Sequence, residues 1–181
     1  MQQVPRFAAM VIVLLVNLAE AAARADELAG NGAERELADL RKEWADELEG
    51  AARSQDYRER AVAYRAVGQF RWRQKEELLR RGLDDESPAC RGSALISLEL
   101  LSRDHPSTVN GVRPLLHTIA TADGNSAVRR LAILCLKNGS PQRDTIVLLQ
   151  GLAADDEQDK EIRQSADKVA ALLKKRGGSR A

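Results

Sequence analysis

Four arginines recur at similar intervals along the chain, each three residues before an alanine. They are Arg58, Arg91, Arg129 and Arg163, and the intervals between them are 33, 38 and 34 residues. A guanidinium group carries several N–H donors in a planar fork, so it can bind carboxylates, phosphates or several carbonyl oxygens at once. The row of arginines therefore either grips an anionic ligand or ties neighbouring structural units together.

The sequence around the arginines favours the second alternative. Each arginine opens a segment whose apolar residues recur every three or four positions, as in a helix with one buried face. Negative charge is the charge favoured at a helix N-terminus, so a repeated arginine there needs a specific partner. Carboxylates in the turns between helices are such partners, and ties between adjacent units stabilise a stack. We therefore interpret the four arginines as a structural ladder.

A second predicted helix precedes each of the last three arginines. These helices contain paired leucines, and the second leucine of each pair lies 12 to 14 residues before its arginine. The pairs are Leu78-Leu79, Leu115-Leu116 and Leu148-Leu149. Ala, Leu, Arg and Glu, which are good helix formers, are common throughout the chain. The pattern predicts four repeats of helix, turn and helix, because a fixed period of this length indicates a stacked repeat.

The best-defined repeat resembles a HEAT repeat. It has Pro114 and paired leucines in its first helix, Asp123 in the turn, and Arg129 and Ala132 at the start of its second helix. The resemblance extends over residues 33–175 and implies an all-α fold, a right-handed α-solenoid of about four helical hairpins. It also implies that turn aspartates pair with the arginines. The candidate aspartates are Asp84 or Asp85, Asp123, and Asp155 or Asp156.

The HEAT resemblance also implies where a partner docks. In HEAT-like stacks the second helices line a concave face, and helical spacing puts the residues one and five positions after each arginine on that face. The resulting candidates are Glu59 and Ala63, Gly92 and Ile96, Arg130 and Leu134, and Gln164 and Lys168.

The first 25 residues have the layout of a secretory signal peptide. Arg6 precedes an apolar run of 12 residues, and Ala23-Arg24-Ala25 forms a cleavage site of the A-x-A type. A membrane-spanning helix needs about 20 apolar residues, so we predict cleavage, with an anchor formed by residues 7–23 as the alternative. The chain then divides into a signal peptide (1–25), a HEAT-like domain (26–176) and a disordered tail (177–181). We expect the protein to be exported.

Residues suited to catalysis or metal binding are scarce. After residue 25 the chain holds His105 and His117, and its two cysteines are Cys90 and Cys135. Their spacings match no metal-binding pattern, and neither a Gly-rich phosphate loop nor a Gly-x-Ser-x-Gly motif occurs. We predict no catalytic residue, no metal site and no cofactor. Whether the cysteines form a disulfide or are buried thiols stays open.

Residues 57–81 combine basic and aromatic side chains, with eight Lys or Arg against three Glu. The candidate contacts in this patch are Arg65, Arg71, Trp72 and Arg73. In an exported protein such a patch suits an acidic protein, an anionic glycan or a membrane surface better than nucleic acid. Residues 26–56 carry 10 acidic and 4 basic residues and would lie beside the patch in a stack. Mutual neutralisation of the two segments is therefore the alternative that we favour.

These observations predict a non-catalytic scaffold that binds a protein partner outside the cytosol. After residue 25 the chain has 26 basic and 26 acidic residues, a balance that argues against nucleic acid as a partner. Two alternatives stay open. One is a weak association with the cell envelope or an anionic glycan through residues 57–81, and the other is an accessory subunit of an enzyme complex.

Overall fold

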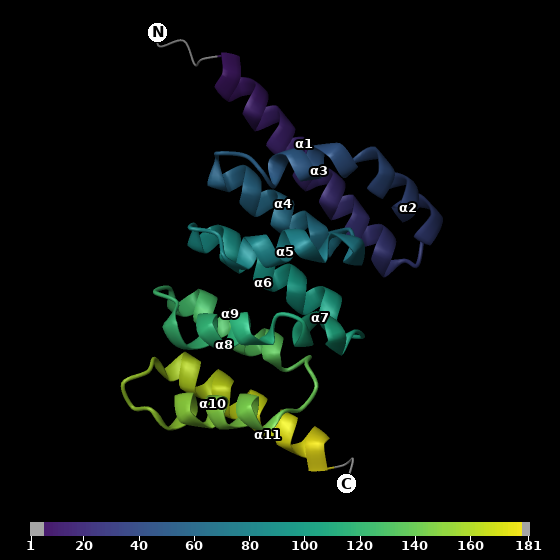
Figure 1. The fold of residues 1–181 in the computed structure, drawn as a ribbon. Coiled ribbons are helices and arrows are strands. Elements are labelled where there is room, and N and C mark those ends of the chain that lie inside the picture. The colour runs from purple at the N-terminus through teal and green to yellow at the C-terminus, as the bar shows by residue number, and fades with distance from the viewer. Residues whose placement is uncertain (1–5, 179–181) are drawn as a thin grey trace.

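A computed structural model describes the backbone of residues 6–178 and the side chains of residues 18–178. The described residues form helices and no strand, which confirms the predicted all-α class (Figure 1). The elements in chain order are α1 (Arg6–Gly30), α2 (Glu34–Glu43), α3 (Ala45–Ala51), α4 (Tyr57–Gln69), the 3-10 helix η1 (Arg73–Lys75), α5 (Glu76–Leu83), α6 (Pro88–Ser102), α7 (Pro106–Asn110), α8 (Arg113–Ala122), α9 (Ser126–Leu136), α10 (Arg143–Ala154) and α11 (Lys160–Gly178). The predicted tail thus begins inside α11, and its residues 179–181 lie outside the described part of the chain.

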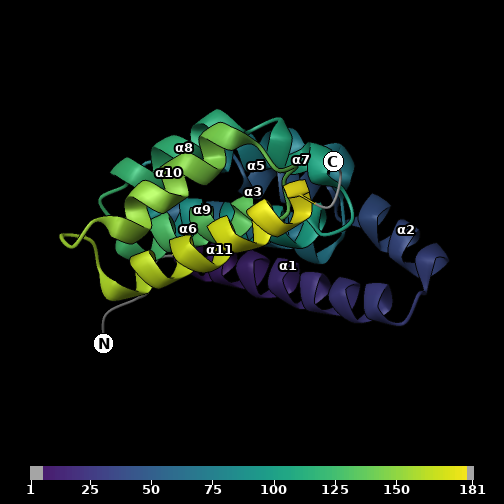
Figure 2. The ribbon, with the colours of Figure 1, turned by 90° about the horizontal axis from the view of Figure 1, so that it is seen from below.

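From α3 onward the helices form hairpins that follow one another along the molecule (Figure 1). We call the first helix of each hairpin (α3, α5, α8, α10) an A helix and the second (α4, α6, α9, α11) a B helix. Successive B helices pack closely against each other, whereas the A helices of successive hairpins have few mutual contacts. Viewed along the stack, α5, α8 and α10 lie in one layer and α6, α9 and α11 in another (Figure 2). The B layer therefore provides most of the contact between hairpins.

Every B helix has the same rotational orientation in the stack. The fourth residue of each B helix is an arginine, and the residue three positions later is an alanine with no exposed surface. The arginines are Arg60, Arg91, Arg129 and Arg163, and the alanines are Ala63, Ala94, Ala132 and Ala166. A small side chain at this position lets adjacent helices approach closely without a void.

Helices α4 and α6 meet at Gly68, which is buried. Its backbone N–H donates to the Oγ atom of Ser97 over 3.2 Å, and the Ser97 hydroxyl donates to the carbonyl of Tyr64 over 2.7 Å. A Cβ atom at position 68 would lie 2.7 Å from the Cα atom of Ser97. Because that distance is far below van der Waals contact, only glycine fits here between the two backbones.

We expect Gly68→Ala to lower the free energy of unfolding by about 1–3 kcal/mol, the usual range for an overpacked core. The added methyl group would press on the backbone of α6, which yields less than a flexible side chain does. Chemical denaturation of the purified proteins measures the difference. Gly151→Ala is the matched control, because nothing lies within 4 Å of a Cβ atom at that helical position. Equal stability of Gly68→Ala and the unsubstituted protein would contradict the packing described above.

Helix α1 packs against α4 as an additional B helix at the N-terminal end of the stack (Figure 2). Its residues Leu18, Ala21, Ala22 and Ala25 are buried. The helix continues without a break through the predicted cleavage site, while the side chains of the earlier residues of the predicted leader lie outside the described part. Among the described residues, no helix combines the length and the apolar character needed to span a bilayer. Cleavage, anchoring and export stay predictions.

Both cysteines are free thiols buried in the stack. The Sγ atom of Cys90 donates to the carbonyl of Tyr57 and that of Cys135 to the carbonyl of Leu95, each over 3.1 Å. Burial raises the pKa of Cys90 to about 11 and also raises the pKa of Cys135. The sequence left open whether the two cysteines form a disulfide or are buried thiols, and the structure contains buried thiols. They stay protonated and pack in the interior of the stack.

Candidate functional site

Arg91 ties the turn of its own hairpin to the turn of the next hairpin. Its Nε and Nη2 atoms donate to the two carboxylate oxygens of Asp123, over 2.6 and 3.0 Å. Its Nη1 atom donates to the backbone carbonyls of Asp85 and Glu86, over 2.8 and 3.0 Å. Because the Asp123 side chain is only 5% exposed, this bidentate pair is shielded from solvent and is stronger than an ordinary surface ion pair.

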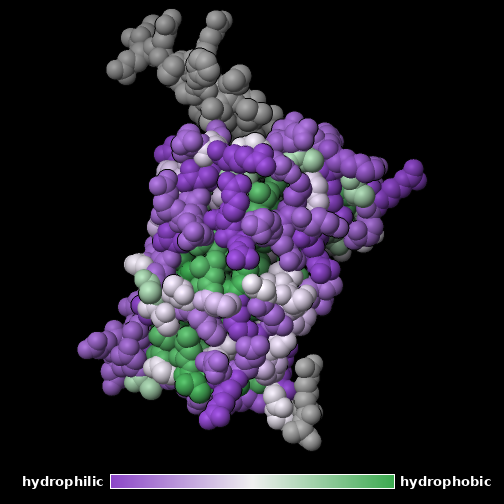
Figure 3. Space-filling view, viewed as in Figure 1, coloured by the Kyte–Doolittle hydropathy of each residue, from purple (hydrophilic) through white to green (hydrophobic). Residues whose placement is uncertain are grey.

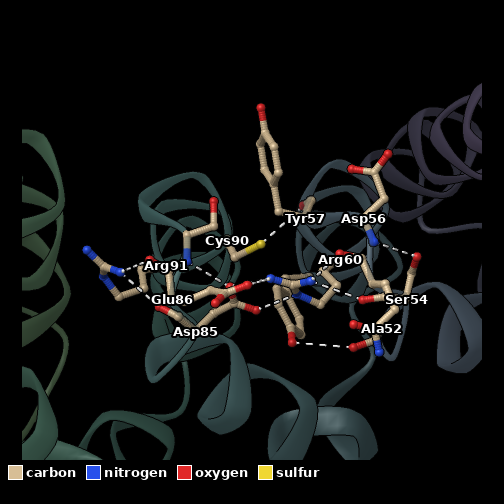
Figure 4. A network of polar contacts seen from close by, with 12 residues as sticks. Ala52, Ser54, Asp56, Tyr57, Arg60, Asp85, Glu86, Cys90 and Arg91 are labelled. Atoms are coloured by element: carbon tan, nitrogen blue, oxygen red, sulfur yellow. Dashed lines mark hydrogen bonds and ion pairs between the residues drawn. The ribbon is translucent and has the colours of Figure 1, made fainter.

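Arg60 makes the same set of contacts one hairpin earlier (Figure 4). Its Nε and Nη2 atoms donate to the carboxylate of Asp85 over 2.7 and 2.9 Å, and its Nη1 atom donates to the carbonyls of Ser54 and Gln55. Burial by itself raises the pKa of Asp85, but hydrogen bonds, first of all from Arg60, hold the net pKa below its usual value. Asp85 also accepts a hydrogen bond from Arg91 through its backbone carbonyl, so consecutive ties share one turn.

The predicted ladder position of Arg58 is therefore wrong by two residues. Arg58 is exposed at the second position of α4 and lies beside the ring of Tyr57, 5.7 Å from the ring centre. The spacing of the motif fits both arginines equally well, because Ala61 lies three residues after Arg58 and Ala63 lies three residues after Arg60. Only Ala63 is fully buried, as are Ala94, Ala132 and Ala166 at the same position of the other B helices, and this shared position identifies Arg60 as the ladder arginine of α4.

The ladder changes in its last two members. Arg129 donates from Nη2 to the Oε1 atom of Gln158 over 2.5 Å, and Gln158 donates in turn to Asp155 over 2.6 Å. An amide thus takes the place that a carboxylate holds in the first two ties. Arg163 donates to Asp156 in its own turn over 3.0 Å. Among the described residues, the ladder ties in which an arginine binds both oxygens of a turn aspartate are therefore those at the interfaces on either side of α6.

The corrected register defines the outer face of the B layer, which we call the B face. Residues one and five positions after each ladder arginine are half-buried or exposed there. They are Ala61 and Arg65, Gly92 and Ile96, Arg130 and Leu134, and Gln164 and Lys168. The predicted Ala63 is fully buried instead, and Glu59 precedes its ladder arginine rather than following it. Arg65, predicted as part of the basic patch, thus joins Ile96 and Leu134 on one face.

The rest of the basic-aromatic patch is largely paired inside the molecule. Arg71 forms an ion pair with Asp26 of α1 over 2.8 Å. Lys75 pairs with a glutamate of α3 and lies over the ring of the half-buried Trp72, 5.2 Å from its centre. Arg73 is exposed, and its ion pair with a neighbouring residue of α5 is long, at 3.7 Å. The acidic segment therefore neutralises Arg71 and Lys75 in the way that we favour from the sequence.

A buried polar cluster between α8 and α10 has no counterpart among the residues predicted from the sequence. Arg113 is 5% exposed and donates to the Oγ1 atom of Thr145 and the carbonyl of Ser140, each over 2.9 Å, and to the side chain of Asn110. The Nε2 atom of His117 lies 3.0 Å from the same Thr145 oxygen. Among the described residues Arg113 forms no ion pair with a carboxylate, and burial lowers its pKa. The sequence signal that could have indicated this cluster is Arg113 itself, a charged residue at the start of the otherwise apolar helix α8.

We expect stability to fall as the pH drops from about 7 to 5, because of His117. Burial, followed by the charge of Arg113, lowers the pKa of His117 in the folded state, although Asp144 opposes the shift. Below the unfolded pKa of about 6.5, the unfolded chain therefore binds more protons than the folded chain, and stability decreases until the folded pKa is passed. Urea denaturation at several pH values measures this slope. The slope should diminish in His117→Gln and persist in His105→Gln, because His105 is exposed.

No group of three or more His, Cys, Asp or Glu side chains that could hold a metal ion occurs among the described residues. A comparison with protein-family models gave no match, and neither did a comparison with curated proteins.

Proposed function

We propose that the protein is a non-catalytic interaction module that binds a protein partner along its B face. In this proposal the hairpins form a right-handed α-solenoid of the HEAT type. The close packing of the B helices and the sparse contacts between A helices support a stack that curves toward the B face. A concave face of this kind surrounds an extended or helical segment on more than one side.

The observation that carries the proposal is the composition of the B face. Ile96 and Leu134 are half-buried apolar side chains on adjacent B helices, and Arg65 occupies the equivalent position on the helix before them. Partly exposed apolar side chains beside a cation suit a partner segment whose apolar residues are flanked by acidic ones. The alternative use of residues 57–81 on an anionic surface is less well supported, because Arg71 and Lys75 already have partners.

Site-specific photo-crosslinking in the native cell tests this proposal. A crosslinking residue at position 96 or 134 should yield the same adduct, and Leu134→Asp should abolish the adduct formed from position 96. Val147, 58% exposed on α10, is the matched control on the other layer. Equal adduct formation from position 147, or none from the B face, would contradict the proposal.

The compartment in this proposal rests on the leader-like sequence of residues 1–25 alone. Cell fractionation should find the protein outside the cytosol, and a purely cytosolic protein would contradict that part. The crosslinking result is independent of it, because none of the residues that define the B face belongs to α1.

A further inference from the structure

The N-terminal end of the stack carries a groove of about 580 Å³ between α1 and α2. Apolar side chains, including Leu28, Leu40 and the half-buried Trp44, line it. Its charged residues are mostly acidic, with Glu20, Glu36, Asp39 and Glu43 against Arg24. A groove of this kind between two helices accepts a third helix that is apolar on the side facing it and basic at its flanks.

The opposite end of the stack presents a helix with that composition. Residues 168–178, at the end of α11, contain four basic and no acidic residues. Lys168, Leu172 and Lys175 are exposed and lie at i, i+4 and i+7, so they share one side of α11. Leu172 is 43% exposed and is one of three exposed large hydrophobic side chains among the described residues. Helices α1 and α11 lie at opposite ends of the molecule (Figure 1).

We propose that the groove between α1 and α2 receives the C-terminal half of α11 from a second copy of this chain. Leu172 then contacts the apolar lining, and Lys168 and Lys175 approach the acidic residues of α1 and α2. The contact joins different surfaces of the two copies, so it extends head to tail instead of forming a closed two-fold dimer. It goes beyond the proposed function, because it needs neither Ile96 nor Leu134, although it shares Lys168 with the B face. It also requires that α1 stays attached to the chain, since Glu20, Ala21 and Arg24 line the groove.

The residue that follows the ladder arginine of α11 by four positions also shows why such a contact depends on charge. Inner B helices bury Tyr64, Leu95 and Ile133 at the position four residues after the ladder arginine, but α11 has the exposed Asp167 there. The stack thus ends on a polar surface, as a terminal repeat does, rather than on an apolar face that must be covered. Contacts between exposed charges are screened by salt over about 10 Å at 0.1 M, so the association should weaken as salt increases.

Sedimentation velocity on the full chain, at 50 and 500 mM NaCl, tests the proposal with two reciprocal variants. Glu36→Lys with Glu43→Lys makes the groove basic, and Lys168→Glu with Lys175→Glu makes the end of α11 acidic. Each variant alone should associate about tenfold more weakly than the unsubstituted chain at low salt, because like charges then face each other. A mixture of the two variants should regain the association, since each groove then meets a tail of opposite charge.

The control variant carries Glu77→Lys and Arg80→Glu, two exposed residues of α5 that lie at neither end, and it should associate normally. Thermal unfolding checks that all variants fold. An unsubstituted chain that is monomeric at both salt concentrations, or a mixture that stays monomeric, would overturn the proposal. So would a monomeric chain whose groove binds a basic amphipathic peptide of another sequence. The B-face crosslinks are formed from positions 96 and 134 of the chain without these substitutions, so the two proposals fail separately.

Discussion

Arg91→Ala should lower the free energy of unfolding by about 2–4 kcal/mol, below the full effect of breaking a buried ion pair because Arg91 is partly exposed. The substitution leaves the nearly buried Asp123 carboxylate without its bidentate partner. It also removes the donor to two carbonyls of the preceding turn, so both sides of one hairpin interface lose a tie. Urea denaturation at pH 7, followed by circular dichroism, measures the loss.

Arg58→Ala is the matched control for Arg91→Ala. Both arginines open a B helix in the same sequence motif, but Arg58 is exposed and outside the ladder. Its removal should change stability by about 0.5 kcal/mol or less, as for most surface substitutions. A larger effect for Arg58 than for Arg91 would show that the ladder register is wrong.

A chain that begins at Asp26 should be less stable than the full chain by about 4 kcal/mol or more. The truncation removes Leu18 and three alanines that are buried against the rest of the stack, at roughly 2–3 kcal/mol for the leucine and 0.8 kcal/mol for each methyl group. It also exposes the face of α4 that α1 covers. Denaturation of the two purified chains under identical conditions measures the difference. Equal stability would mean that α1 contributes nothing to the fold.

A pair of point substitutions separates this packing effect from the effect of shortening the chain. Ala22 has no exposed surface and Ala23 is exposed, although they are neighbours on one helix. Ala22→Asp should destabilise the protein by several kcal/mol, because it buries an unpaired charge, while Ala23→Asp should be close to neutral. If both substitutions are neutral, cleavage after Ala25 would leave the stack intact. If they differ as expected, cleavage would uncover α4.

The sequence allows the hairpins and one complete tie of the ladder to be predicted. The paired leucines and the arginine spacing depend on local periodicity, which a helix expresses directly. Arg91 and Asp123 lie in clear motifs of two successive hairpins, and the structure joins them at 2.6 Å. The hairpins and the tie between Arg91 and Asp123 could be predicted because the local sequence pattern agrees with the tertiary contacts at these positions.

Other features depend on packing that a local pattern does not encode. Arg58 and Arg60 both precede an alanine by three residues, so the choice between them follows only from which of the two alanines the folded stack buries. The small residues Ala21, Ala22 and Ala25 suit a cleavage site and a closely packed helix equally well. The burial of Arg113 depends on acceptors contributed by residues about 30 positions away.

A double-mutant cycle on Arg60 and Asp85 tests most directly the central claim that bidentate arginine ties join successive hairpins. The unfolding free energies of Arg60→Ala, Asp85→Ala and the double variant give the coupling energy of the pair. We predict a coupling energy of about 1–3 kcal/mol for Arg60 and Asp85, and additive effects when Arg58→Ala replaces Arg60→Ala in the cycle. Additive effects for Arg60 and Asp85, or a coupling between Arg58 and Asp85 instead, would contradict it.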